Sequence, residues 1–143
     1  IGGEQSPYVD KVTNDGATIT TISSQLDYNN GNARVNSAGA YYNGVVYICG
    51  GIGAVDVGTL TCATDTVARA SSAIMAGMSP AGGCTYMTGL SMTGRAAFTG
   101  GFDQNASTYY NNMWGMTSSA AITALGCTLS TSRASAAGAG KTS

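Results

Sequence analysis

The sequence predicts an all-β protein built from one four-stranded antiparallel unit that occurs three times. Glycine pairs recur at a near-constant interval, which is 48 residues from Gly3 to Gly51 and 50 residues from Gly51 to Gly101. A period of this length is typical of arrays of like supersecondary units. Apolar and aromatic runs precede the second and third pairs, at residues 45–49 and 96–99. Both runs have the composition of β-strands.

The composition indicates an ordered protein. Hydrophobic residues make up 43% of the chain and charged residues only 9%, whereas disordered chains combine low hydrophobicity with high charge. A chain of 143 residues is long enough to bury a hydrophobic core. We therefore expect one region of β-structure rich in small residues, with repeats over residues 3–51, 51–101 and 101–143.

Two turn signals organise the first repeat. Asp15-Gly16 and Asn43-Gly44 each lie between strand-like segments, and both dipeptides favour the positive φ angles of two-residue hairpin turns. Between the two expected hairpins, residues 23–32 are polar and are predicted to form a surface loop. The expected strands of this repeat are residues 8–14, 17–22, 38–42 and 45–49.

The second and third repeats are expected to follow the same order, with the glycine pair after the second strand. Loops are predicted over residues 52–58 and 102–108, and a longer connection over residues 88–93 joins the two strands of the next hairpin. The expected strands are residues 59–62, 66–70, 83–87, 94–99, 110–116, 120–125 and 134–138.

The run at residues 45–49 is apolar at every position instead of alternating. A strand with this pattern is predicted to be buried on both faces of its sheet. Both faces are covered when a sheet lies between similar sheets, as the radially packed blades of a β-propeller do. We therefore expect propeller-like packing of the repeated unit.

The four cysteines are predicted to be buried thiols. An even number leaves three disulfide pairings open, but the cysteines sit among small and apolar residues, where a free thiol packs as a small hydrophobe. No CxxC spacing and no histidine occur in the sequence, which argues against a zinc site. The cysteines are Cys49, Cys62, Cys84 and Cys127.

Charge and residue types exclude several functions. The net charge is −1, with six basic and seven acidic residues, so the basic surface that binds nucleic acid is absent. No apolar stretch has the length of a membrane span. Without histidine the commonest general base is missing, and the scattered carboxylates form no evident acid pair. We therefore expect a protein that is not an enzyme and needs no cofactor or metal.

The repeat resembles the kelch repeat of β-propellers. An arginine and small residues lead to an apolar strand that ends in a glycine pair, and Trp114 loosely matches the aromatic residue that kelch repeats place later in the unit. The Thr-, Ala- and Gly-rich style of residues 131–140 looks more like the kelch-like repeats of bacteriophage tail and virion appendage proteins. The resemblance implies kelch-like blades and an extracellular or virion-associated binding role.

The number of repeats predicts that more than one chain is needed to form a closed propeller. Three blades cannot close a ring, since propellers typically have four to eight. The repeats are also out of phase with the blades, so that residues 135–138 supply a strand that the hairpin at residues 9–22 lacks. We expect a homodimer that forms one six-bladed propeller. The alternative is a fragment of a larger propeller enzyme, such as a glycan-active hydrolase or lyase.

The candidate binding residues lie in the connections that follow second and fourth strands. These connections leave the sheets on one side, because consecutive antiparallel strands alternate in direction. Aromatic side chains beside Asn and Asp suit contacts with a glycan or with a protein surface, although solvated loops share this composition. Arg34 and Arg133 are expected to bond loop carbonyls. The candidate ligand-binding residues are Tyr8, Tyr28, Asn29, Asn30, Asp56, Asp103, Asn105 and Tyr109.

Overall fold

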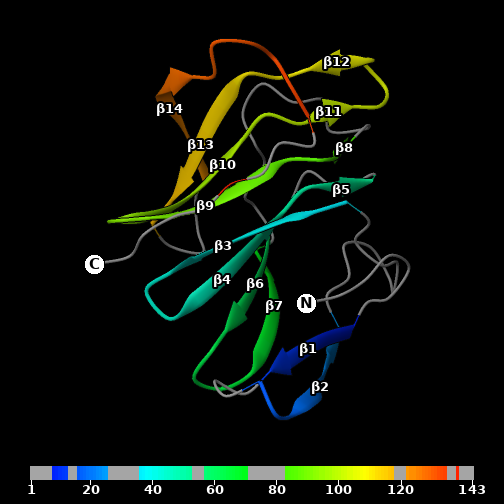
Figure 1. The fold of residues 1–143 in the computed structure, drawn as a ribbon, viewed down its shortest axis with the longest axis vertical. Helices are drawn as coiled ribbons and strands as arrows, with labels where there is room; N and C mark the ends of the chain where they lie inside the picture. The colour runs from blue at the N-terminus through cyan, green and yellow to red at the C-terminus, as the bar shows by residue number, and fades with distance from the viewer. Residues whose placement is uncertain are drawn as a thin grey trace.

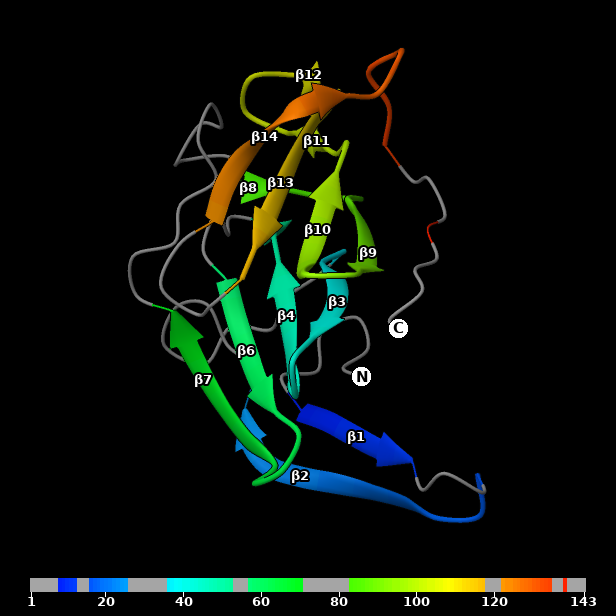
Figure 2. The ribbon, with the colours of Figure 1, turned by 90° about the vertical axis from the view of Figure 1, so that its left-hand side faces the viewer.

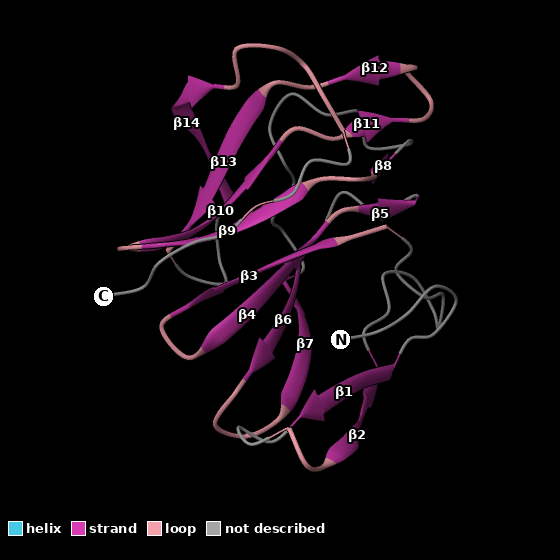
Figure 3. Cartoon of the chain, in the orientation of Figure 1, coloured by secondary structure: helices cyan, strands magenta, loops and turns pink. Residues whose placement is uncertain are grey.

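The computed structural model describes residues 8–12, 16–25, 36–52, 57–70, 83–117, 122–134 and 138. Within these ranges the chain contains strands and turns and no helix. Two four-stranded antiparallel sheets and three two-stranded sheets make up the structure (Figure 1, Figure 3). The prediction of an all-β fold is confirmed. In the described part of the chain the sheets do not close into a ring.

Sheet I has the strand order β3 (Ala38–Tyr42), β4 (Val45–Cys49), β6 (Val57–Thr61) and β7 (Thr66–Ala70). Asn43 and Gly44 have φ angles of 48° and 80°, and Tyr42 pairs with Val45 across them. The two-residue hairpin turn expected from the Asn-Gly signal is therefore confirmed.

Sheet II repeats this order with β9 (Thr88–Met92), β10 (Arg95–Thr99), β13 (Asn112–Met116) and β14 (Ile122–Thr128). The expected connection over residues 88–93 is wrong, because most of it forms β9. The turn is Thr93-Gly94, with Met92 paired to Arg95 and φ of 86° at Gly94. Gly94 lies 50 residues after Gly44, so the repeat itself carried the signal.

A hairpin precedes sheet I, formed by β1 (Tyr8–Val12) and β2 (Ile19–Gln25). Val12 pairs with Ile19, and the two are equally distant in sequence from Asp15-Gly16. The register is thus the one that a turn at this dipeptide requires. Residues 23–25, which we expected to belong to a loop, belong to β2. Gln25 lies opposite Tyr8, and residues 23 and 24 form an irregularity between this pair and the pair Val9–Ile22.

Two short pairings order the connections between strands. β5 (Gly51–Ile52) pairs with β8 (Gly83–Cys84), and β11 (Phe102–Asp103) pairs with β12 (Thr108–Tyr109). The expected loops at residues 52–58 and 102–108 therefore contain short strands. The strands β5, β8, β11 and β12 lie on one side of the molecule, away from the tight turns of the large sheets (Figure 1). We call this side the loop side.

The main core lies between the facing sheets I and II (Figure 2). Tyr47, Cys49 and Val57 of sheet I are buried together with Phe98, Trp114 and Met116 of sheet II, among other apolar residues. Aromatic and sulfur-containing side chains of this size bury a large apolar area, which is the main source of stability.

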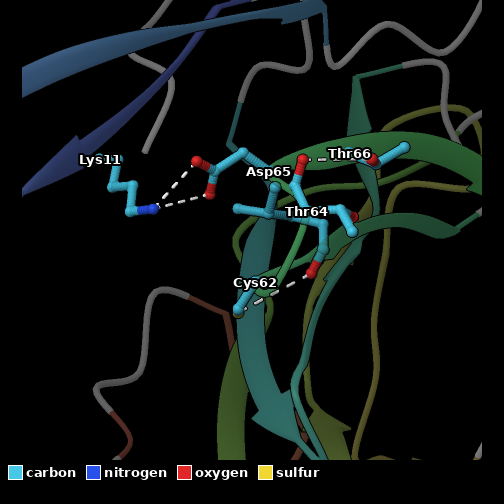
Figure 4. A network of polar contacts seen from close by, with 6 residues as sticks. Lys11, Cys62, Thr64, Asp65 and Thr66 are labelled. Atoms are coloured by element: carbon cyan, nitrogen blue, oxygen red, sulfur yellow. Dashed lines mark hydrogen bonds and ion pairs between the residues drawn. The ribbon is translucent and has the colours of Figure 1, made fainter.

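The opposite face of sheet I is covered by the hairpin β1–β2. Val9 and Ile22 are buried there against Ile48, Leu60 and Val67. Lys11 adds an exposed ion pair, with Nζ at 2.9 Å from Asp65 Oδ2 in the turn between β6 and β7 (Figure 4). Strand β4 is therefore covered on both faces, as its uninterrupted apolar sequence predicted.

Strands β3 and β9 approach each other through glycines. A Cβ atom added at Gly89 would overlap the backbone of Gly39, so neither backbone could come as close if Gly89 carried a side chain. Tyr41 N donates to Ser91 Oγ at 2.9 Å across the same contact. The first strands of the two large sheets thus lie directly against each other.

The cysteine prediction is confirmed only in part. Cys49, Cys62 and Cys127 are free thiols, and Cys49 is completely buried. Cys62 and Cys127 are exposed, because Cys62 lies in the turn after β6 and Cys127 lies on a face of β14 that no described element covers. The side chain of Cys84 falls outside the described residues.

Candidate functional site

The glycine pairs start the connections on the loop side. Gly50 and Gly51 have φ angles of 71° and 117°, and Gly100 and Gly101 have 68° and 113°. Residues that carry a side chain rarely adopt such positive φ angles. A Cβ atom on Gly100 would also lie 2.7 Å from the carbonyl oxygen of Arg133. Both the backbone angles and the close approach explain why the repeat requires glycine here.

Asp103 orders the hairpin β11–β12. Its carboxylate is completely buried, and Oδ1 accepts hydrogen bonds from the backbone N–H groups of Asn105 and Ala106, at 2.9 and 3.0 Å. Oδ2 accepts a bond from the Tyr110 hydroxyl at 3.3 Å. A buried carboxylate must be bonded in this way to be tolerated. Asp103 therefore shapes the loop from beneath, and its oxygens do not face solvent.

An aromatic pair lies beside this carboxylate. Phe102 and Tyr109 face each other across the small hairpin, with ring centroids 4.7 Å apart and planes tilted by 42°. Tyr109 is 56% exposed, whereas Phe102 is half-buried. The Phe102 ring thus supports the Tyr109 ring, whose outer surface is open to a ligand.

Asn105 lies at the exposed end of the same hairpin. Residues 104–108 are all exposed, and Thr108 Oγ1 donates to the Ala106 carbonyl at 2.9 Å. Ser107 has a positive φ of 49°. These local bonds give a compact turn that presents the amide of Asn105 and the ring of Tyr109 from one short segment.

Tyr86 is an aromatic residue that sequence reasoning missed. Its neighbour Thr85 exchanges two backbone hydrogen bonds with Phe102, at 3.0 and 2.9 Å, which joins this segment to the aromatic pair. Tyr86 is 43% exposed and has φ of 57°. Asn36, 50 residues earlier, has nearly the same φ of 60°. Comparison of the repeats at this interval was the signal that could have found it.

The backbone of Arg133 is hydrogen-bonded to two segments of the loop side. Its carbonyl accepts from Gly101 N at 2.8 Å, and its N–H donates to the Tyr110 carbonyl at 3.1 Å. Its side-chain Nε donates to the Thr131 carbonyl at 3.3 Å. The expectation that Arg133 bonds a loop carbonyl is confirmed, whereas Arg34 lies outside the described residues.

Among the described residues, the structure brings three of the candidate binding residues together. Asp103, Asn105 and Tyr109 share the hairpin β11–β12. Tyr8 begins β1, two sheets away in the stack, and its side chain is outside the described part. The remaining predicted residues also lie outside the described ranges, and they are Tyr28, Asn29, Asn30 and Asp56.

The described residues contain no cluster of metal-ligating side chains. No group of three His, Cys, Asp or Glu residues in the described ranges is arranged to hold a metal ion. Burial and the nearby Tyr42 raise the pKa of the Tyr47 phenol above its ordinary value of 10.0, but Tyr47 lies in the core. None of the described segments forms a helix long and apolar enough to cross a membrane.

Comparison with known proteins supports the fold only. No family model matches the chain, and no curated protein is similar to it. Among solved structures, the structure of YjhT aligns with a TM-score of 0.64 and 15% sequence identity. The alignment covers 92% of this chain and 53% of that chain, so the chain spans about half the length of the structure it matches.

Proposed function

We propose that the chain is a non-catalytic recognition module, built as part of a β-propeller with kelch-like blades. In this proposal sheets I and II are two successive blades, and hairpin β1–β2 is the outer half of the blade before them. The face-to-face packing of the sheets, the close contact of their first strands at Gly39 and Gly89 and the repeated glycine pairs support it. Propeller blades pack radially in this way.

The exposed ring of Tyr109 carries the functional part of the proposal. It is backed by Phe102 and fixed by the buried carboxylate of Asp103, which bonds the turn between them. A ring held in place loses little conformational entropy when it binds, which favours affinity. Asn105 beside it supplies donors and acceptors.

The chemistry of this surface fits a glycan or a polar protein surface. An aromatic face stacks on the apolar side of a sugar ring, and an amide bonds the hydroxyl groups at its edge. Tyr and Asn are also residues that binding loops use for protein contacts. A component of an adhesin or of a virion appendage would use such a surface for attachment.

A glycan-array screen of the protein and of Tyr109→Ala tests this function. We expect binding of the intact protein to a defined glycan class. In Tyr109→Ala we expect a loss of about fivefold or more, taking stacking of a sugar to be comparable to stacking of a base on an aromatic residue, about 1–3 kcal/mol. Tyr41→Ala is the matched control, because Tyr41 is an exposed tyrosine beside the tight turn of β3–β4. Equal losses in both variants would contradict the assignment to the loop side.

We further propose that the module assembles by dimerisation into a closed propeller of about six blades. No described strand covers the outer face of hairpin β1–β2 or the outer face of sheet II, where Gly138 lies against Thr88 and Leu90 at the β9 edge. The aligned region makes up 53% of the YjhT chain, which fits two copies supplying what one longer chain supplies there. Sedimentation of the 143-residue protein as a folded monomer at micromolar concentration would refute this assembly.

A further inference from the structure

The outer face of hairpin β1–β2 carries the most exposed apolar pair of the described residues. Val12 and Ile19 lie opposite each other in register and are 54% and 69% exposed. Side chains alternate between the two faces of a strand, and Val9 and Ile22 face sheet I. Val12 and Ile19 therefore point away from sheet I, together with Asp10 and Thr21, which are joined by a hydrogen bond of 2.8 Å.

Each large sheet has an equivalent apolar pair, and in each sheet a neighbouring sheet packs over this pair. Leu60 pairs with Val67 in sheet I, and Met116 pairs with Ile122 in sheet II. Each pair joins the third and fourth strands of its unit close to the connection between them. Leu60 and Val67 pack against hairpin β1–β2, and Met116 and Ile122 are buried in the core with sheet I. In each case the preceding sheet covers the pair.

The residues that pack over such a pair also have equivalents in sheet II. Val9 and Ile22 receive Leu60 and Val67. The corresponding positions of sheet II are Met113 and Leu125. Both lie on the face turned away from sheet I, because the residues before or after them, Ala124 and Trp114, pair with each other and Trp114 faces sheet I. Both are only half-buried. Leu125 lies over Gly115, at 3.1 Å from the position of a Cβ atom there.

The two faces that no described strand covers also carry opposite charges. Asp10 lies on the outer face of the hairpin, next to Val9 in sequence and opposite Thr21. Arg95 lies on the outer face of sheet II, where its Cδ approaches Gly115 beside Leu125. Apolar pairs and unlike charges on both faces make them complementary.

We propose that the outer face of hairpin β1–β2 in one copy packs on the outer face of sheet II in a second copy, with Val12 and Ile19 against Met113 and Leu125. A twofold axis repeats the contact, so that two copies bury both pairs of faces. This inference deepens the proposed assembly and rests on it. It is independent of ligand binding on the loop side, which involves other residues.

Two single variants test the contact by light scattering or sedimentation. Ile19→Asp and Leu125→Lys each place a charge in both copies of the proposed interface, so each variant alone should have the mass of one chain, 14.3 kDa, where the intact protein has twice that mass. Tyr86→Lys is the control, since it puts a charge on an exposed aromatic residue of the loop side and should leave the dimer intact. Circular dichroism checks that every variant is folded.

Mixing the two variants identifies the partner faces. In a mixed dimer, Asp at position 19 of one copy meets Lys at position 125 of the other, and the second interface is unchanged. We therefore expect the mixture to recover the dimer mass. A monomeric intact protein, a dimeric Ile19→Asp variant, or a mixture that stays monomeric would each overturn the proposal. Loss of glycan binding in Tyr109→Ala with an unchanged mass would leave it standing, so the two failures are distinguishable.

Discussion

At the scale of single residues, Asp103 shows how the sequence and the structure assign different tasks to one side chain. Its position in a polar loop made it a candidate ligand residue. The structure buries its carboxylate and bonds it to two backbone N–H groups and to the Tyr110 hydroxyl. Burial depends on the later segment at Tyr110, and no local pattern in the sequence reveals it.

Replacement of Asp103 should therefore destabilise the protein before it affects binding chemistry. Asp103→Ala removes the buried acceptor of two backbone N–H groups and of the Tyr110 hydroxyl. We expect a loss of about 2–3 kcal/mol in the free energy of unfolding, measured by urea denaturation. Asp103→Asn keeps one acceptor oxygen and should lose less than half as much. Equal effects of the two variants would show that the hydrogen bonds of Oδ1 do not order the turn.

Tyr47 makes the stability of the folded protein depend on pH in the alkaline range. Burial, and then the neighbouring Tyr42, raise the pKa of its phenol above 10.0, so the unfolded chain ionises at a lower pH than the folded one. The stabilisation is complete below about pH 10 and is lost as the pH rises beyond it, by up to about 1.4 kcal/mol per pH unit. Urea denaturation between pH 8 and pH 11 should show this loss, and Tyr47→Phe should reduce it. The same alkaline slope in both proteins would refute the role of Tyr47.

At the scale of elements, the repeat contains a turn signal that the local dipeptides lack. Asn43-Gly44 was recognised as a turn from its dipeptide, whereas Thr93-Gly94 was missed, because Thr is not a preferred turn residue. Both turns lie at the same position of the repeat, 50 residues apart. Residues 23–25 could not be assigned to β2 from their polarity, since the pairing of Gln25 with Tyr8 keeps this end of β2 in the sheet.

The contact between β3 and β9 makes a second element-scale prediction. Gly89→Ala places a methyl group against the backbone of Gly39, which cannot move without shifting a strand. We expect a loss of about 3 kcal/mol or more in thermal or urea unfolding. Gly126→Ala in β14 is the control, because nothing lies within 4 Å of its Cβ position. That variant should be neutral or slightly stabilising, and a similar loss in both would argue against close packing of the first strands.

At the scale of the whole molecule, the order of the faces determines how copies can meet. Hairpin β1–β2 covers sheet I, and sheet I covers sheet II. In both contacts the equivalent face of the later sheet packs against the sheet that precedes it in the chain. The stack is therefore directional. Its two ends differ, and contact between unlike ends closes into a ring only when the rotation per unit completes a full turn.

Assembly through unlike ends couples folding to protein concentration. If unfolding separates two copies, each tenfold increase in concentration stabilises the folded dimer by about 1.4 kcal/mol. For a chain of this length we expect the melting temperature to rise by about 2–3 °C per tenfold increase. Differential scanning calorimetry over two decades of concentration measures this slope. In Ile19→Asp the slope should vanish while a cooperative transition remains, because the covered faces between the sheets are unchanged; a slope retained in that variant would locate the subunit contact elsewhere.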